Sequence, residues 1–195
     1  MIIWSFISDL EGGLQLRGYI PGSHSGVTVA GGVDLGYQDA ADLRAYPAPL
    51  QAKLAPYVGL RGSFARAYLN KHPLTLTDDE AEAVEAPVRA AFLTEVRNHF
   101  GAEFEEIPDA AQTVIMSVTW QYGDPWSDPK CGDFWKLACA QDWDALADYL
   151  DDFPDKRFIT RRRHEAGFLR AGTFDGPVPK PDPDPSVEED AADGD

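Results

Sequence analysis

The chain has 195 residues, a formal net charge of −16, 44% hydrophobic residues and five tryptophans. This length and composition predict a folded protein with a real core, either one domain or two small lobes around a cleft. The excess of acids excludes a nucleic-acid-binding protein, because such proteins carry a basic surface. It also argues against bulk electrostatic attraction to an anionic polymer.

The first ten residues predict a short helix, because Trp4, Phe6, Ile7 and Leu10 follow helical spacing. The apolar opening is too short to span a membrane. It also lacks the charged start and the small-residue cleavage site of a signal peptide. We therefore expect synthesis in the cytoplasm without a signal peptide, so that a substrate outside the cytoplasm would require separate export.

The stretch from Leu10 to Gly36 carries the strongest candidate chemistry. Glu11 ends the first helix, and a run rich in glycine and β-branched residues follows, which predicts a small hairpin or meander. Thr28 and Asp34 lie on that run. An acid at a helix end with a hydroxyl and a second carboxylate on a small sheet is typical of a glycosidase. One acid protonates the leaving oxygen while the other group activates water.

Thr28 and Asp34 meet only if the chain reverses between them, because six extended residues span about 20 Å. The reversal would lie at Ala30-Gly31-Gly32. A three-residue turn pairs Val29 with Val33 and places Thr28 opposite Asp34, whereas a two-residue turn does not. The two glycines permit either turn.

The middle of the chain reads as a series of helices separated by turns. Pro87 falls inside the longest helical pattern, so one kinked helix and two separate helices are equally compatible with the sequence. A capping box, Thr77-Asp78-Asp79-Glu80, opens this pattern. The predicted helices span 39–46, 47–58 and 77–100, and a further helix between the last two begins at its cap, Ser63.

The C-terminal half predicts a buried central helix, because Ala110–Tyr122 is apolar nearly all round. Helices over 133–141, 143–150 and 155–171 follow, and Gly172 ends the last one. The run R-R-R-H-E at 161–165 predicts a solvated face. Its functional alternatives are to hold Glu11, to bind substrate carboxylates or to dock the acidic tail.

Residues 174–195 differ in composition from the rest of the chain. They are rich in proline and carry eight acids and one lysine, a net of −7, which leaves −9 of the total for residues 1–173. Such a segment has little to bury, so we expect it to be disordered beside a catalytic domain of residues 1–173.

The two cysteines, Cys131 and Cys139, would lie about 12 Å apart on a helix, too far for a disulfide. We expect two reduced thiols. No grouping of Cys, His, Asp and Glu has the spacing of a metal site.

The motifs E-G-G-L, G-Y-x-P and S-G-V-T-V-A-G-G-V-D-L-G resemble the pesticin-type branch of the phage-lysozyme superfamily. Other phage lysozymes place an acid between the Glu and the Thr, but residues 12–27 contain none. The order Glu11, Thr28, Asp34 is the pesticin-type order. The resemblance, in element order through Gly172, implies a mostly helical α+β fold. This lysozyme-like fold has two lobes, a small β-hairpin sheet and a long connecting helix.

The same resemblance implies a role for each matching residue. Glu11 is expected as the general acid, and Asp34 with Thr28 as the groups that position water. An arginine at the start of the last helix is expected to hold the acid; Arg161 matches that position and Arg157 competes with it. Substrate-binding or supporting roles are expected for Gln121, Tyr19 and His24.

The implied activity is that of an N-acetylmuramidase, which needs no cofactor and acts on peptidoglycan glycan strands in the periplasm. An inverting reaction would separate the two carboxyls by about 6.5–9.5 Å. The implied biological role is a phage endolysin or an antibacterial toxin or effector, with a holin, a secretion system or an immunity protein as partner. The alternatives are a chitinase or chitosanase of the same superfamily and an inactive wall-binding protein.

Overall fold

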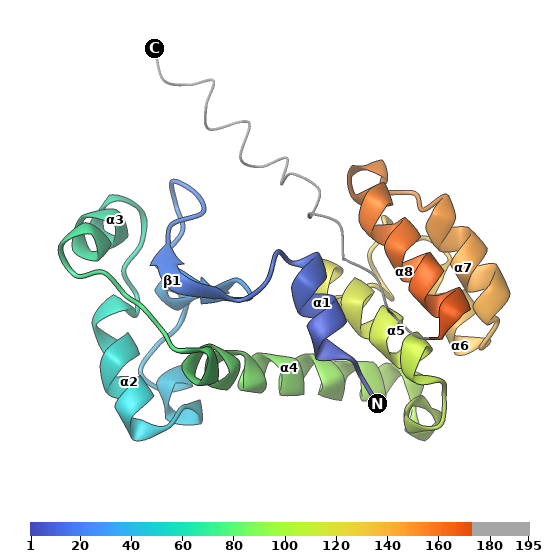
Figure 1. The fold of residues 1–195 in the computed structure, drawn as a ribbon, viewed down its shortest axis with the longest axis horizontal. Coiled ribbons are helices and arrows are strands. Elements are labelled where there is room, and N and C mark those ends of the chain that lie inside the picture. The colour runs from blue at the N-terminus through green and yellow to red at the C-terminus, as the bar shows by residue number, and fades with distance from the viewer. Residues whose placement is uncertain (173–195) are drawn as a thin grey trace, which may run out of the picture. The chain divides into compact units, whose positions relative to one another are not determined.

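The computed structural model describes residues 1–172 (Figure 1). These residues form two compact units, of which the first contains Met1–Gly12 with residues 90–172 and the second contains Gly13–Arg89. Each unit has its own cluster of buried hydrophobic residues. Helices dominate and one small antiparallel sheet is present, so the expected α+β class is confirmed. The predicted acidic tail lies outside the described residues.

The sheet belongs to the second unit and forms a meander of three antiparallel strands. The strands are β1 (Gln15–Tyr19), β2 (Thr28–Ala30) and β3 (Val33–Asp34). Val29 pairs with Val33, and Thr28 pairs with Asp34. The chain therefore reverses through the three-residue turn, one of the two turns that the sequence permits. Every residue of β2 is buried, so this strand anchors the sheet in the core of its unit.

Several of the predicted helices in this unit are shorter than expected. The 39–46 segment forms only a 3₁₀ turn, η2 (Asp42–Ala45), and 47–58 divides into α2 (Ala48–Leu54) and η3 (Ala55–Tyr57). The capping role predicted for Ser63 is wrong, because α3 (Gly62–Lys71) begins one residue earlier and its N-cap is Arg61. A further 3₁₀ turn, η1 (Leu35–Tyr37), follows β3 directly.

Helix α4 (Asp78–Phe100) begins at the predicted capping box. The amide of Glu80 donates to Thr77 Oγ1 at 3.2 Å, and the amide of Thr77 donates to Glu80 Oε2 at 2.9 Å. Pro87 lies inside this helix without dividing it, so the single-helix alternative is confirmed. The boundary between the two units falls within α4, after Arg89.

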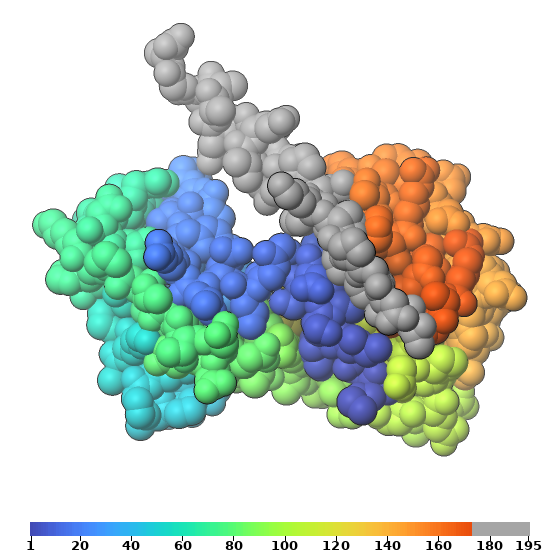
Figure 2. Space-filling view, viewed as in Figure 1, coloured from blue at the N-terminus to red at the C-terminus, as the bar shows by residue number. Residues whose placement is uncertain are grey.

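The first unit is helical and is centred on α5 (Asp109–Tyr122), whose residues from Ala110 to Thr119 are all buried. Both α1 (Trp4–Leu10) and α8 (Ile159–Ala171) contact α5 (Figure 1). The C-terminal helices pack as one block, coloured orange to red in Figure 2. The remaining elements are η4 (Ala102–Glu105), α6 (Phe134–Cys139), α7 (Trp143–Asp151) and η5 (Lys156–Phe158).

Both cysteines are free thiols, as expected. Cys131 is buried, and burial raises the pKa of its thiol to about 12, so it stays protonated. Among the described residues, every helix is too short or too polar to cross a bilayer.

The hairpin turn of the second unit rests on a buried acid of α4. Glu85 is 3% exposed, pairs with Arg89 and accepts a hydrogen bond from the amide of Gly31. Burial raises the pKa of Glu85, although Arg89 and the Gly31 amide oppose that effect. A Cβ atom on Gly31 would lie 1.9 Å from Glu85 Oε1. The register of β2 and β3 therefore depends on a glycine at this position.

We predict that Gly31→Ala destabilises the protein by about 1–3 kcal/mol, because the methyl group displaces a buried, paired carboxylate. The free energy of unfolding in urea measures the effect. Gly167→Ala is the matched control, since nothing lies within 4 Å of a Cβ at this position in α8. Alanine there should stabilise by about 0.5–1 kcal/mol. A Gly31→Ala variant as stable as the original would contradict the role of Glu85.

Candidate active site

Glu11 directly follows α1, where it is the C-cap residue, and its side chain is 27% exposed. The preceding Leu10 is buried in the core of the first unit and fixes the end of the helix. Gly12 and Gly13 follow with φ of 86° and 81°, a conformation that glycine adopts without strain. The local sequence thus ends the helix and leaves a partly exposed carboxylate at its tip.

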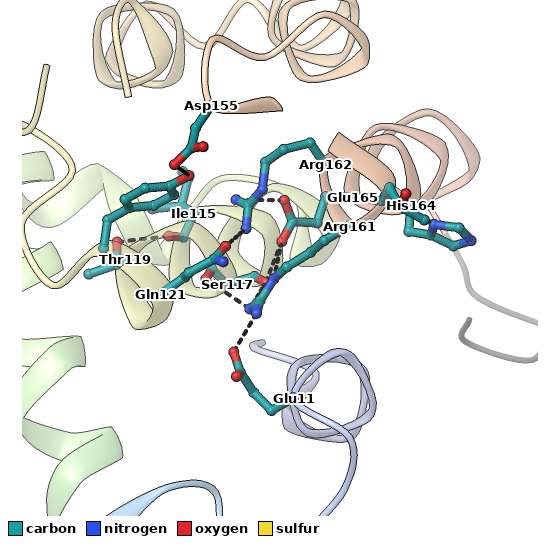
Figure 3. Close-up of polar contacts among 12 residues, drawn as sticks. Glu11, Ile115, Ser117, Thr119, Gln121, Asp155, Arg161, Arg162, His164 and Glu165 are labelled. Carbon is teal, nitrogen blue, oxygen red and sulfur yellow. Dashed lines mark hydrogen bonds and ion pairs between the residues drawn. The ribbon is translucent and has the colours of Figure 1, made fainter. Parts of the chain in front are cut away.

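Arg161 is the arginine that holds this carboxylate. Its Nη1 lies 2.5 Å from Glu11 Oε1, and its side chain is only 7% exposed (Figure 3). The competing Arg157 instead pairs with Asp155 Oδ2 at 2.6 Å. The choice that the sequence left open is therefore decided in favour of Arg161.

The other nitrogens of the Arg161 guanidinium contact two buried groups. Nε lies 3.3 Å from Glu165 Oε1, and Nη2 donates to Ser117 Oγ at 3.0 Å. Ser117 Oγ in turn lies 2.5 Å from Glu165 Oε1. Three helical elements, the end of α1, the middle of α5 and the first turns of α8, thus fix one guanidinium group.

Arg162 extends this network on the inner side of α8. Both Arg162 and Glu165 are fully buried, and Arg162 Nη1 lies 2.8 Å from Glu165 Oε2. Arg162 also donates to Gln121 Oε1, which places the predicted Gln121 in the same network (Figure 3). The expectation of a solvated face is therefore wrong for Arg161, Arg162 and Glu165, whereas Arg163 is exposed. Glu165 follows Arg161 by four residues and Arg162 by three, and this spacing was the signal in the sequence that these side chains pair.

The two arginines differ in how burial and charge act on their pKa values. Burial alone would lower the pKa of Arg161, but the carboxylates of Glu11 and Glu165 raise it above its ordinary value. Burial lowers the pKa of Arg162, and Glu165 only partly offsets this effect because Arg161 acts in the same direction as burial. Two carboxylates therefore face Arg161, whereas only that of Glu165 pairs with Arg162.

Thr28 and Asp34 lie in the second unit. They are paired directly across the neighbouring strands β2 and β3. The Asp34 carboxylate accepts hydrogen bonds from the amides of Gly26 at 3.0 Å and Gly36 at 2.8 Å. Thr28 Oγ1 donates to the carbonyl of Gly26 at 3.4 Å, and Thr28 is 2% exposed. Gly26 therefore links both side chains, and a Cβ there would lie 2.4 Å from Asp34 Oδ1. Asp34 has a structural role whatever its chemistry.

The remaining predicted residues also lie in the second unit. Tyr19 ends β1 and is 38% exposed. His24 lines an open hollow of about 380 Å³, together with Tyr37 and Arg61, whose guanidinium carbon lies 4.9 Å from the Tyr37 ring centre.

We predict that Arg161→Met destabilises the protein by about 2–4 kcal/mol, because it leaves Glu165 buried with one cation fewer. Arg163→Met is the control on the same helix. Arg163 is exposed, so its loss should change the free energy of unfolding by less than about 0.5 kcal/mol. Chemical denaturation of both variants measures the difference, and equal stabilities would show that the buried network contributes nothing to folding.

No curated protein matches the sequence. Residues 1–144 match the family described as pesticin, the C-terminal domain of a bacterial toxin homologous to phage lysozyme. The matched segment includes Glu11, Thr28, Asp34 and the whole sheet, and it ends inside α7. Because this match covers most of the chain, the protein belongs to the pesticin family of phage-lysozyme homologues.

Proposed function

We propose that this protein is a peptidoglycan hydrolase, an N-acetylmuramidase that cleaves the β-1,4 bond between N-acetylmuramic acid and N-acetylglucosamine. Its membership of a lysozyme-like toxin family supports the reaction class. The observation that carries the proposal is the Glu11–Arg161 pair: a partly exposed acid at a helix end, held by a buried guanidinium.

Glu11 is the general acid in this proposal. Arg161 contacts Oε1 at 2.5 Å and fixes the orientation of the carboxyl group. With 27% of its side chain exposed, Glu11 remains accessible to a glycosidic oxygen. Such an acid protonates the leaving oxygen as the bond to the sugar breaks.

Asp34 positions or deprotonates the attacking water in this proposal, and Thr28 helps to hold that water. A carboxylate has about four acceptor sites. The amides of Gly26 and Gly36 hold the Asp34 carboxylate in place and leave acceptor capacity for a water. The Thr28 hydroxyl donates to a carbonyl, so its lone pairs are available to accept from the same water.

The proposed place of action is the peptidoglycan of the periplasm, where the protein serves as an antibacterial toxin or effector, or as an endolysin. Secretion or holin machinery and an immunity protein are the partners that such roles require. A chitinase or chitosanase activity is the alternative within the same reaction class. The near-complete burial of Thr28 limits the access of water to its hydroxyl, so an inactive protein that binds the wall is one further candidate.

We predict that Glu11→Gln lowers the rate of wall lysis by about 10²-fold or more, because the amide cannot donate the proton. The loss of turbidity of purified peptidoglycan measures the rate, and mass spectrometry of the products identifies the cleaved bond. Glu95→Gln, a change of an exposed acid on α4, is the control and should retain the original rate. Lysis at a near-original rate by folded Glu11→Gln would refute the assignment, and absence of lysis by the original protein would favour the wall-binding alternative.

We predict inversion of configuration at the cleaved anomeric carbon. A hydroxyl that holds water has a role in the inverting reaction, whereas a retaining enzyme uses its second carboxylate as the nucleophile. Proton NMR of the first-formed products distinguishes the α from the β anomer. A β product, or a covalent glycosyl adduct on Asp34, would make Asp34 a nucleophile and leave Thr28 without its proposed role.

A further inference from the structure

The first unit contains a cluster of four ionisable side chains, namely Glu11, Arg161, Arg162 and Glu165. It contains two acids and two arginines, so its formal charge is zero when all four are ionised (Figure 3). Three of its members, Arg161, Arg162 and Glu165, are at most 7% exposed. A proton on Glu11 therefore leaves an excess positive charge in a largely buried cluster.

Ser117 determines how the members of this cluster are connected. A guanidinium group only donates hydrogen bonds, so Ser117 Oγ accepts from Arg161 Nη2. The single hydroxyl proton of Ser117 then points to Glu165 Oε1, 2.5 Å away. Oε1 also faces Arg161 Nε, and Oε2 faces Arg162. Glu165 Oε1 thus accepts hydrogen bonds from Ser117 and Arg161, whereas Oε2 makes an ion pair with Arg162 without a hydrogen bond of good geometry.

We propose that Glu165 is a positioning residue for Glu11, because it fixes the plane of the Arg161 guanidinium and shares its positive charge. This inference rests on the proposed function, in which Glu11 must hold a proton until the glycosidic oxygen receives it. An arginine paired with Glu11 alone would favour the ionised carboxylate and leave no acid. Because Glu165 contacts the other edge of the guanidinium, Arg161 still orients Glu11. It stabilises the ionised Glu11 carboxylate less than it would without Glu165.

The other titratable groups near the cluster keep a constant charge around neutral pH. Tyr122 and Cys131 interact with Arg162, but burial raises the pKa of both and keeps them neutral. Asp155 accepts a hydrogen bond from Tyr122, and its pairing with Arg157 lowers its pKa and keeps it ionised. The proton on Glu11 therefore responds chiefly to Arg161 and to the two side chains behind it.

Two substitutions test this role with opposite expected signs. Glu165→Gln removes a negative charge, so Glu11 should lose its proton at a pH lower by roughly 0.5–1.5 units. Arg162→Gln removes a positive charge from the same cluster, so Glu11 should keep its proton to a pH higher by a similar amount. A role in packing alone would not produce opposite shifts.

The titration of the Glu11 carboxyl is followed by carbon-13 NMR, and the pH profile of lysis of purified peptidoglycan is recorded in parallel. The upper limb of that profile should move with the NMR midpoint. Arg163→Gln, which changes an exposed arginine beside the cluster, and Glu165→Asp, which keeps the charge, should each stay within about 0.3 pH units of the original protein.

Circular dichroism first establishes which variants fold, and either of the two charge-changing variants is sufficient for the test. A midpoint within about 0.3 units of the original value in a folded Glu165→Gln or Arg162→Gln variant would overturn the role of Glu165. Shifts of both variants in the same direction would also overturn it. The NMR titration needs no catalysis, so failure of the proposed function appears separately, as absence of lysis by the original protein.

Discussion

The burial of the Arg161 guanidinium is the constraint on which the first unit depends. A buried cation without partners is unfavourable by several kcal/mol, so a stable fold must surround it with acceptors. The acceptors come from the end of α1, from Ser117 of α5 and from Glu165 of α8 itself. These three elements are distant in sequence, and the packing of α1 and α8 on α5 brings their acceptors to one place. The position of Glu11 is thus a consequence of how the core satisfies one arginine.

The two candidate catalytic carboxylates are fixed in physically different ways. A guanidinium with a full positive charge holds Glu11, whereas main-chain amides of Gly26 and Gly36 hold Asp34. A cation and main-chain amides both favour an ionised carboxylate, but only the cation brings a full charge that a nearby anion can offset. An acid fixed by a cation therefore needs a compensating anion if it is to carry a proton, and Glu165 is the buried anion on the far side of Arg161. Asp34 needs no such compensation to act as a base.

The surface charge imposes a further constraint on the proposed function. A net charge of −16 disfavours the approach of an anionic wall polymer, so recognition must rely on short-range contacts. The hollow lined by His24, Tyr37 and Arg61 shows that basic and aromatic groups still gather locally on this acidic chain. Buried arginines do not contribute to such contacts, because Arg161 and Arg162 are paired inside the first unit.

The sequence by itself determined the features that depend on neighbouring residues. The capping box at Thr77 and Glu80, the central apolar helix and the glycine that ends the last helix follow from local hydrogen bonding and periodicity. The tertiary structure decided whether Pro87 divides a helix and which turn sets the register of Thr28 and Asp34, because packing selects among local options of similar energy. It also decided that Arg161 rather than Arg157 holds Glu11. The pairing of Glu165 with Ser117 could not be predicted, because a charged run on a helix reads as exposed until the surface that covers it is known.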